Sequence, residues 1–319
     1  MAIQKLDKAC NVALKDYMGL SNEESLLVIS DEQRREVGLA LFEQGKLLAK
    51  EAFYVEMKSG EVNGQEPPDA IAQMMLQMDV VVCPTTKSLT HTNARRAASA
   101  KGVRVGTMPG ITSEIMARCF SADYTKIIQT SDLVSEKLTP ASKVVVETKS
   151  GTYLVLPMKD RRVITSTGVL RNKGEGGNLP SGEVYLAPWE HQSNGVLVVD
   201  GSVSGIGLVK DPIYIEIVNG YAVRITGKEE ADKLNKMLDA VGPDARAVAE
   251  FGFGTNYKAK ICGQILEDEK VLGTIHIAFG NNISMGGNVN VPIHIDAIIK
   301  HPTVSFDDEV VMDKGRLLI

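Results

Sequence analysis

The chain has 319 residues, of which 44% are hydrophobic and 24% are charged. These proportions are typical of a globular protein and exclude a disordered or fibrous one, and the length is sufficient for two domains with separate cores. The formal net charge of −5 leaves no basic surplus to neutralise a phosphate backbone. We therefore expect no nucleic-acid partner.

No segment resembles a membrane or export signal. The first residues, Met1–Lys8, lack the apolar core of a signal peptide. No apolar run approaches the roughly 20 residues that span a bilayer. We expect a cytoplasmic protein that does not contact a membrane. The four cysteines are far apart and form no C-x-x-C pair, which predicts buried, reduced thiols rather than disulfides or a zinc knuckle: Cys10, Cys83, Cys119 and Cys262.

The first part of the chain alternates between helix and strand patterns. The strands are expected at Ser25–Ser30, Phe53–Met57, Asp79–Pro84 and Val103–Gly106. The helices are expected at Ile3–Tyr17, Glu32–Lys50, Pro67–Met78, Asn93–Lys101, Ser113–Cys119 and Asp132–Leu138. Runs that are apolar on both faces are typical of buried parallel strands. The alternation predicts an α/β domain with a mainly parallel sheet over residues 1–140.

After Thr139-Pro140 the pattern changes to short strands separated by turn residues. These strands are expected at Lys143–Thr148, Thr152–Pro157, Glu183–Leu186, Gly195–Asp200, Ile213–Val218 and Tyr221–Thr226, with Asn219-Gly220 as a hairpin turn. Only Lys228–Val241 has a clear helical pattern. We predict a β-rich α+β domain over residues 141–319.

Two of the five histidines lie in apolar surroundings near the C-terminus. His276 follows Gly273-Thr274-Ile275, and His294 is followed two positions later by Asp296. Side chains at i and i+2 of a strand share a face, so His294 and Asp296 would point the same way. This arrangement predicts a pair of metal ligands. A half-buried strand with its polar side chains facing water would explain the same pattern.

Two glutamates extend this candidate site. Glu183 begins an apolar strand, and Glu250 opens the segment Glu-Phe-Gly-Phe-Gly, whose glycines allow something to approach the backbone closely. Either glutamate alone would suit an ordinary strand end. Together with His276, His294 and Asp296, they form a ligand set for two divalent ions, which can activate a bridging water for hydrolysis.

A polar segment, Thr85–Thr92, follows the strand at Asp79–Pro84. Loops at the carboxyl ends of parallel strands often contact ligands, so Thr90 and His91 are candidates for a cleft, and His91 is the candidate catalytic residue. A hydroxyl cap for the next helix explains the threonines equally well. His191 is a further cleft candidate, and no general base is assigned. The chain shows no dinucleotide fingerprint, phosphate loop or serine-nucleophile elbow.

The candidate residues occur in segments that resemble the metal-dependent aminopeptidases typified by aminopeptidase T and aminopeptidase S, the thermophilic metalloprotease family. The resemblance is carried by Asn178–Pro188, Glu250, His276–Gly280 and His294–Asp296, with Ser88–Arg95 in the first domain. It implies a homodimer that removes N-terminal residues from peptides or small amides. It also implies two ions of zinc, cobalt or manganese, held by Glu183, Glu250, His276, His294 and Asp296, with Glu250 as the bridge.

The chain departs from that family at two places. Ile283 stands seven residues after His276, where the family has a catalytic tyrosine, and the interval from His276 to His294 is shorter than in the family. The same region is similar to ring-cleaving dioxygenases acting on dihydroxypyridines, which implies one Fe(II) held by His276, His294 and Asp296. Because Glu183 and Glu250 are both present, we expect the hydrolase, with the dioxygenase as the alternative and a non-catalytic metal-stabilised binding protein as a third possibility.

Overall fold

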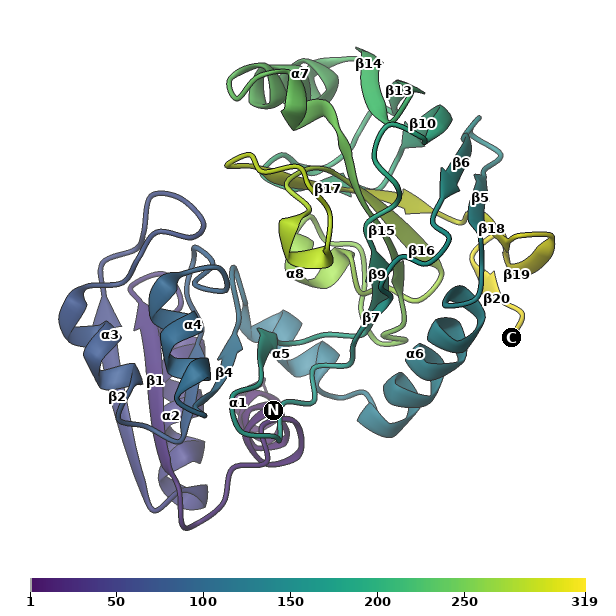
Figure 1. Ribbon diagram of the computed structural model, residues 1–319. Helices are drawn as coiled ribbons and strands as arrows, with labels where there is room; N and C mark the ends of the chain where they lie inside the picture. The colour runs from purple at the N-terminus through teal and green to yellow at the C-terminus, as the bar shows by residue number, and fades with distance from the viewer. Residues whose placement is uncertain (1) are drawn as a thin grey trace. The chain divides into compact units, whose positions relative to one another are not determined.

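The computed structural model describes residues 2–319 (Figure 1). It divides into two compact units. The first contains the chain up to Tyr124 and a second segment, Thr167–Ser181; the second unit comprises Thr125–Ser166 and Gly182–Ile319. The sequence placed its boundary near residue 140. The structure differs because α6 (Tyr124–Leu138) buries Val134 and Leu138 in the core of the second unit.

The first unit is built on a five-stranded parallel sheet. In spatial order its strands are β2 (Glu51–Met57), β1 (Ser25–Asp31), β3 (Val80–Cys83), β4 (Arg104–Thr107) and β8 (Gly176–Asn178). Its helices are α1 (Ala2–Val12) with the π-helical turn η1 (Ala13–Tyr17), α2 (Arg35–Leu48), α3 (Asp69–Met75), α4 (Asn93–Ala100) and α5 (Ser113–Cys119). The sequence missed β8, whose Gly-Gly-Asn carries no apolar pattern.

Helices cover both faces of this sheet. Leu27, Ile29 and Val81 pack in one apolar cluster with residues of α3 and α4. On the opposite face α2 crosses so closely that a Cβ on Gly45 would lie 2.3 Å from the Leu26 side chain. Every residue of β1 is buried. This double burial explains the continuous apolar run that marks the strand in the sequence.

The second unit contains two antiparallel sheets. The eight-stranded sheet has the order β14 (Tyr221–Thr226), β13 (Ile213–Val218), β10 (Asn194–Val199), β6 (Tyr153–Pro157), β5 (Lys143–Glu147), β18 (Thr303–Phe306), β19 (Glu309–Asp313) and β20 (Arg316–Leu317). The seven-stranded sheet has the order β12 (Gly207–Leu208), β11 (Ser202–Val203), β17 (His294–Lys300), β16 (Thr274–Gly280), β15 (Val248–Gly254), β9 (Glu183–Leu186) and β7 (Ile164–Ser166). The predicted fold class of both halves is confirmed.

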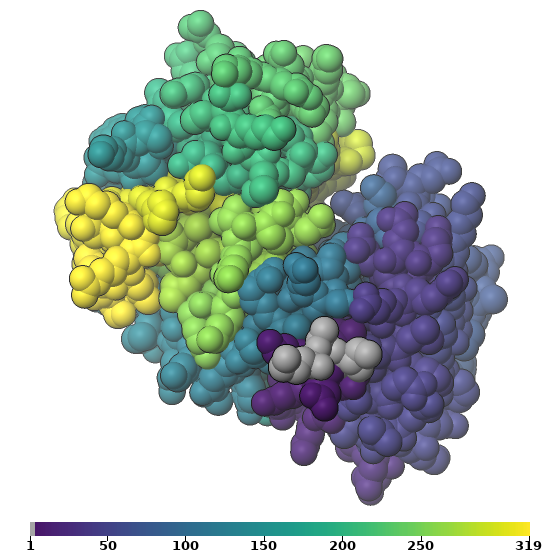
Figure 2. All heavy atoms as spheres, turned by 180° about the vertical axis from the view of Figure 1, so that it is seen from behind, coloured from purple at the N-terminus to yellow at the C-terminus, as the bar shows by residue number. Residues whose placement is uncertain are grey.

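Besides α6, the second unit has one further helix of ordinary length and three short helical segments in the described part of the chain. They are α7 (Glu229–Asp239), α8 (Ile265–Asp268) and the 3₁₀ turns η2 (Pro243–Arg246) and η3 (Ile283–Met285). The residues near the C-terminus, yellow in Figure 2, lie at the surface of this unit, where Leu318 is exposed. No helix in the described part of the chain is both long enough and apolar enough to cross a membrane.

The core of the second unit determines which side chains of the seven-stranded sheet remain available for chemistry. Phe251, Phe253, Ile275, Ile277 and Ile295 belong to one buried cluster with apolar residues of the eight-stranded sheet. Because side chains alternate along a strand, the residues between them point to the other face. That other face carries the candidate metal ligands.

Candidate metal centre

The structure brings together all five residues that the sequence singled out. They come from four neighbouring strands: Glu183 from β9, Glu250 from β15, His276 from β16, and His294 and Asp296 from β17. All five lie on the sheet face away from the apolar core. His276 is fully buried, with 1% of its side chain exposed, whereas His294 is 33% exposed. The site therefore has one open side.

Glu250 lies between the two histidines. Its Oε1 is 3.0 Å from Nε2 of His276, and its Oε2 is 3.2 Å from Nε2 of His294. His294 Nε2 is also 3.3 Å from Oδ1 of Asp296, and His276 Nε2 is 3.8 Å from Oε2 of Glu183. Both imidazoles thus present the same nitrogen to a set of carboxylate oxygens. Imidazole nitrogens and carboxylates are ligands that iron, zinc and manganese accept.

The two glycines of the Glu-Phe-Gly-Phe-Gly segment are required by close neighbours. A Cβ on Gly252 would lie 1.9 Å from Nε2 of His276, so the imidazole lies directly over this residue. A Cβ on Gly254 would lie 2.2 Å from the carbonyl oxygen of Val271. The close approach predicted from the sequence is confirmed. One glycine makes room for a ligand, and the other makes room for the backbone that follows α8.

That backbone carries two charged residues that the sequence analysis missed, Glu269 and Lys270. Lys270 is fully buried, and its Nζ donates hydrogen bonds to Glu269 and to Oε1 of Glu183, the latter at 2.7 Å. The segment Glu267-Asp268-Glu269-Lys270 looks like a solvated run of charges in the sequence. The need for a close approach at Gly254 was the one signal that could have placed it against the sheet.

The ligand-capable side chains fall into two groups. Glu183, Glu269 and His276 form one, and Glu250, His294 and Asp296 form the other; within each group, one ligand atom per residue lies within 4.8 Å of the others. The donor set fits a metal ion. Nδ1 of His276 is buried and has no hydrogen-bond partner among the described residues, so the cluster fixes this ring from the Nε2 side.

The carboxylates dominate the electrostatics. Burial alone would lower the pKa of His276, but its hydrogen bond to Glu250 and the charges of Glu250, Glu183 and Asp296 raise that pKa to about 9. Burial raises the pKa of Glu269 to about 8, with Lys270 opposing the rise and Glu183 adding to it. The charges of Glu183, Glu250 and Asp296 therefore create a negative potential that favours cations. A divalent ion would satisfy it better than protonated histidines.

The loop between β16 and β17 orients His294. Nδ1 of His294 donates to the carbonyl oxygen of Asn281 at 2.7 Å, which leaves Nε2 for the cluster. The next residue after Asn281, Asn282, is buried. Its side chain donates to Oε1 of Glu190 at 2.9 Å and accepts from the Val289 amide at 2.8 Å. Ile283, at the position of the expected tyrosine, is 48% exposed.

The other candidates are not members of these metal groups. His91 is exposed and lies in the first unit, and His191 lies beside Tyr221 with ring centroids 5.4 Å apart. Thr92 is the cap of α4, accepting from the Arg95 amide, as the alternative explanation of this segment predicted. Thr90 bonds to Thr107 and Asn178 at the carboxyl ends of β4 and β8.

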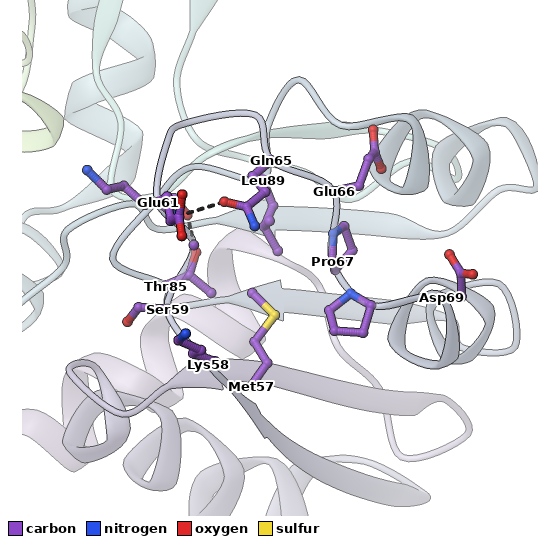
Figure 3. A pocket seen from close by; sticks show the side chains of 13 residues that line it. Met57, Lys58, Ser59, Glu61, Gln65, Glu66, Pro67, Asp69, Thr85 and Leu89 are labelled. Carbon is purple, nitrogen blue, oxygen red and sulfur yellow. Dashed lines mark hydrogen bonds between the residues drawn. The ribbon is translucent and has the colours of Figure 1, made fainter.

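A cavity of about 440 Å³ lies at the carboxyl ends of β2 and β3 in the first unit. Figure 3 shows Met57, Lys58 and Thr85 along its wall, and also the hydrogen bond that Gln65 accepts from the Glu61 amide. Lysines and acidic residues both line it. The polar segment contributes Thr85, Lys87 and Leu89 to this cavity, whereas the two candidates Thr90 and His91 are not among the described residues at its surface.

The fold combines a parallel α/β unit with an antiparallel β-rich unit, the ligand set fits a metal ion, and comparison with known proteins identifies the family. The family model for 2,5-dihydroxypyridine 5,6-dioxygenase matches residues 16–319. The chain belongs to this family. The 2,5-dihydroxypyridine 5,6-dioxygenase of Pseudomonas putida KT2440 is 24% identical over 257 residues, which cover 75% of this chain and 71% of that protein.

Two solved structures share the fold. The 2,5-dihydroxypyridine dioxygenase from Pseudomonas putida KT2440 aligns over 100% of this chain and 98% of its own, with a TM-score of 0.84 and 19% identity. Wild-type AmpT, aminopeptidase T, from Thermus thermophilus aligns over 99% of both chains, with a TM-score of 0.73 and 15% identity. The resemblance to the aminopeptidases is therefore correct for the fold.

The expected function is corrected by these comparisons. The prediction of a hydrolase, specifically an aminopeptidase or protease, is wrong, because the family model and the curated relative are both dioxygenases. The error has a physical origin. The sequence favours the hydrolase because Glu183 can serve there as a ligand of a second ion, but in the structure its Oε1 is paired with the Lys270 ammonium. The alternative hypothesis, a ring-cleaving dioxygenase, has the better support.

Gly252→Ala tests the placement of His276. The added methyl would lie 1.9 Å from Nε2 and must displace the ring, although alanine is otherwise no worse than glycine in a strand. We expect Mn(II) affinity, measured by electron paramagnetic resonance, to fall at least about tenfold, as when ligand positioning is lost. Gly177→Ala is the control, since its Cβ would meet Leu170 at an ordinary 3.6 Å. Unchanged affinity in Gly252→Ala would refute this role.

Asn282→Ala tests the loop that orients His294. The change removes bonds to Glu190 and to the Val289 amide, so the loop that holds Nδ1 of His294 loses its internal support. We expect Mn(II) affinity to fall by about tenfold, the lower end of the effect of outer-shell changes. The exposed Asn288 offers the control variant Asn288→Ala, which keeps the backbone bond to Glu190. Equal affinities for the two variants would contradict the assignment.

Proposed function

We propose that the chain is a metal-dependent ring-cleaving dioxygenase of a dihydroxylated pyridine, with 2,5-dihydroxypyridine as the first substrate to test. The family and the names of the relatives supply the reaction class. The observation that carries the proposal is the arrangement of two histidines and one carboxylate on adjacent strands. His276 lies on β16, and His294 and Asp296 lie on β17.

These three side chains have the composition of the facial ligand set of non-haem Fe(II) oxygenases. We propose that His276 and His294 bind Fe(II) through Nε2, and that Asp296 binds through its carboxylate. An iron ion held there would supply the electron exchange that dioxygen needs to react with an aromatic ring. The exposed side of His294 gives a ring substrate its access.

The remaining residues of the site orient groups and hold protons. Asn281 fixes the His294 ring through Nδ1. Glu250 lies against Nε2 of both histidines, and we assign to its carboxylate the proton that a ring hydroxyl loses on binding. This assignment replaces the bridging role that the aminopeptidase resemblance implied for Glu250.

The overall reaction balances without an added reductant. Dioxygen adds across the C5–C6 bond of 2,5-dihydroxypyridine, and that ring bond breaks. C5, which already carries a hydroxyl, becomes a carboxylic acid, and C6 becomes a formyl group on the ring nitrogen. Both oxygen atoms end in the product, an unsaturated acid bearing an N-formyl amide. The product therefore distinguishes this activity from oxidation without ring opening.

Oxygen consumption tests the proposal. Protein loaded with Fe(II) under anaerobic conditions is mixed with 2,5-dihydroxypyridine and labelled dioxygen, and uptake and product mass are measured. We expect one dioxygen consumed per ring and both labelled atoms in the product. His294→Ala should lower the rate at least about 100-fold, because the ion loses a ligand. His301→Asn, at an exposed histidine outside the site, should retain the rate.

The proposal fails if the iron-loaded protein consumes no dioxygen with any dihydroxypyridine. Such a result, with iron bound, would favour the metal-stabilised binding protein. Equal losses in His294→Ala and His301→Asn would also contradict the assigned site.

A further inference from the structure

We propose that the ammonium group of Lys270 permanently occupies the second cation position of the cluster, so that the centre accepts one divalent ion and not two. The proposal rests on the proposed function only in assuming that a metal binds at this site. The number of ions can be counted whatever reaction they support. Neither Lys270 nor Glu269 was among the ligands implied by the sequence.

The first ligand group already contains a cation. Nζ of Lys270 bonds to Glu183 and to Glu269, which are two of the three members of that group. The second group contains no lysine or arginine: its carboxylates lie against the imidazoles, and Oδ2 of Asp296 also accepts a hydrogen bond from the Ser204 hydroxyl at 3.4 Å. The third member of the first group, His276, points its Nε2 at Glu250 of the second group, 3.0 Å away. The side chains that remain for an ion are therefore His276, His294 and Asp296, with the carboxylate of Glu250 beside both imidazoles.

The position of Lys270 is fixed by its backbone as well as by its charge. Its carbonyl oxygen accepts from the Asn256 amide at 2.8 Å, and its amide donates to Glu267 at 3.0 Å. Gly254 on β15 lets this backbone lie against the sheet, since a Cβ there would come within 2.8 Å of the Lys270 carbonyl carbon. With no exposed surface, the side chain has no route to solvent without movement of this segment.

Charge explains why an ion and this ammonium exclude each other. A second divalent ion would need oxygens of Glu183 and Glu269 that Nζ already occupies. It would also lie beside a buried positive charge, where repulsion is poorly screened. Lys270 instead neutralises the carboxylate charge of this half of the cluster without a metal ion. The ion in the other half then keeps open positions for substrate and dioxygen, which a mononuclear oxygenase needs.

Metal counting tests the proposal directly. The wild-type chain and Lys270→Met are equilibrated with excess Mn(II), freed of unbound metal, and analysed by elemental mass spectrometry and electron paramagnetic resonance. We expect one Mn(II) per chain in the wild type, with the spectrum of an isolated ion. In Lys270→Met we expect two ions per chain and the spectrum of a coupled pair. Two ions in the wild type, or one in folded Lys270→Met, would overturn the proposal.

A second pair of variants keeps the test decisive if Lys270→Met does not fold. Glu269→Gln changes the half of the cluster that Lys270 occupies, and Asp296→Asn changes the half assigned to the ion. We expect Mn(II) affinity to fall less than about tenfold in Glu269→Gln and at least about 100-fold in Asp296→Asn. Comparable large losses in both would show that the ion is shared between the halves, and the proposal would be wrong.

These readouts separate the two proposals. One ion per chain without oxygen consumption would leave the role of Lys270 standing and refute the dioxygenase. Oxygen consumption by a two-ion protein would do the reverse.

Discussion

The absence of side chains at Gly252 and Gly254 is the constraint on which the centre depends. These glycines lie on the face of β15 that carries Glu250. The first admits the His276 ring, and the second admits the backbone of Lys270 and Val271. With a side chain at either position, one half of the cluster could not reach the sheet. The lack of a side chain at Gly252 and Gly254 thus determines which charged groups lie close together on the sheet.

The charges that meet there are costly to bury. Glu183, Glu250, Glu269 and Asp296 are all largely shielded from water. Buried carboxylates are tolerated when they are paired, and removing one partner of a buried pair typically costs about 3–5 kcal/mol. Lys270 supplies a permanent partner for two of them. The other two face the histidines, and a metal ion there would stabilise the folded protein by binding its native state.

Much of this centre could be predicted from the sequence because it lies on regular strands. The i, i+2 spacing placed His294 and Asp296 on one face, and the glycine alternation after Glu250 signalled a close approach. The alternation of helices and strands gave the class of the first unit. The apolar run of β1 is visible because that strand is buried on both faces. In each case the spacing of residues along one segment indicates which face of that segment is buried.

The rest depended on contacts between distant segments. Glu269 and Lys270 follow the short helix α8, and nothing in their local pattern shows that Lys270 reaches Glu183 on β9. Without that contact, Glu183 looked like a ligand for a second ion, and the chemistry was read as hydrolysis. The strand β8 joins its sheet across a long stretch of chain with no apolar signal. The homodimer implied by the resemblance stays a prediction.

The central claim is that one iron ion is bound by His276, His294 and Asp296 while Lys270 holds the other half of the cluster. Anomalous diffraction at the iron edge, from anaerobic crystals of the Fe(II)-loaded chain, tests this most directly. The account predicts one iron peak in contact with those three side chains, and Nζ of Lys270 still bonded to Glu183 and Glu269. Two iron peaks, or a single peak between Glu183 and Glu269, would contradict it.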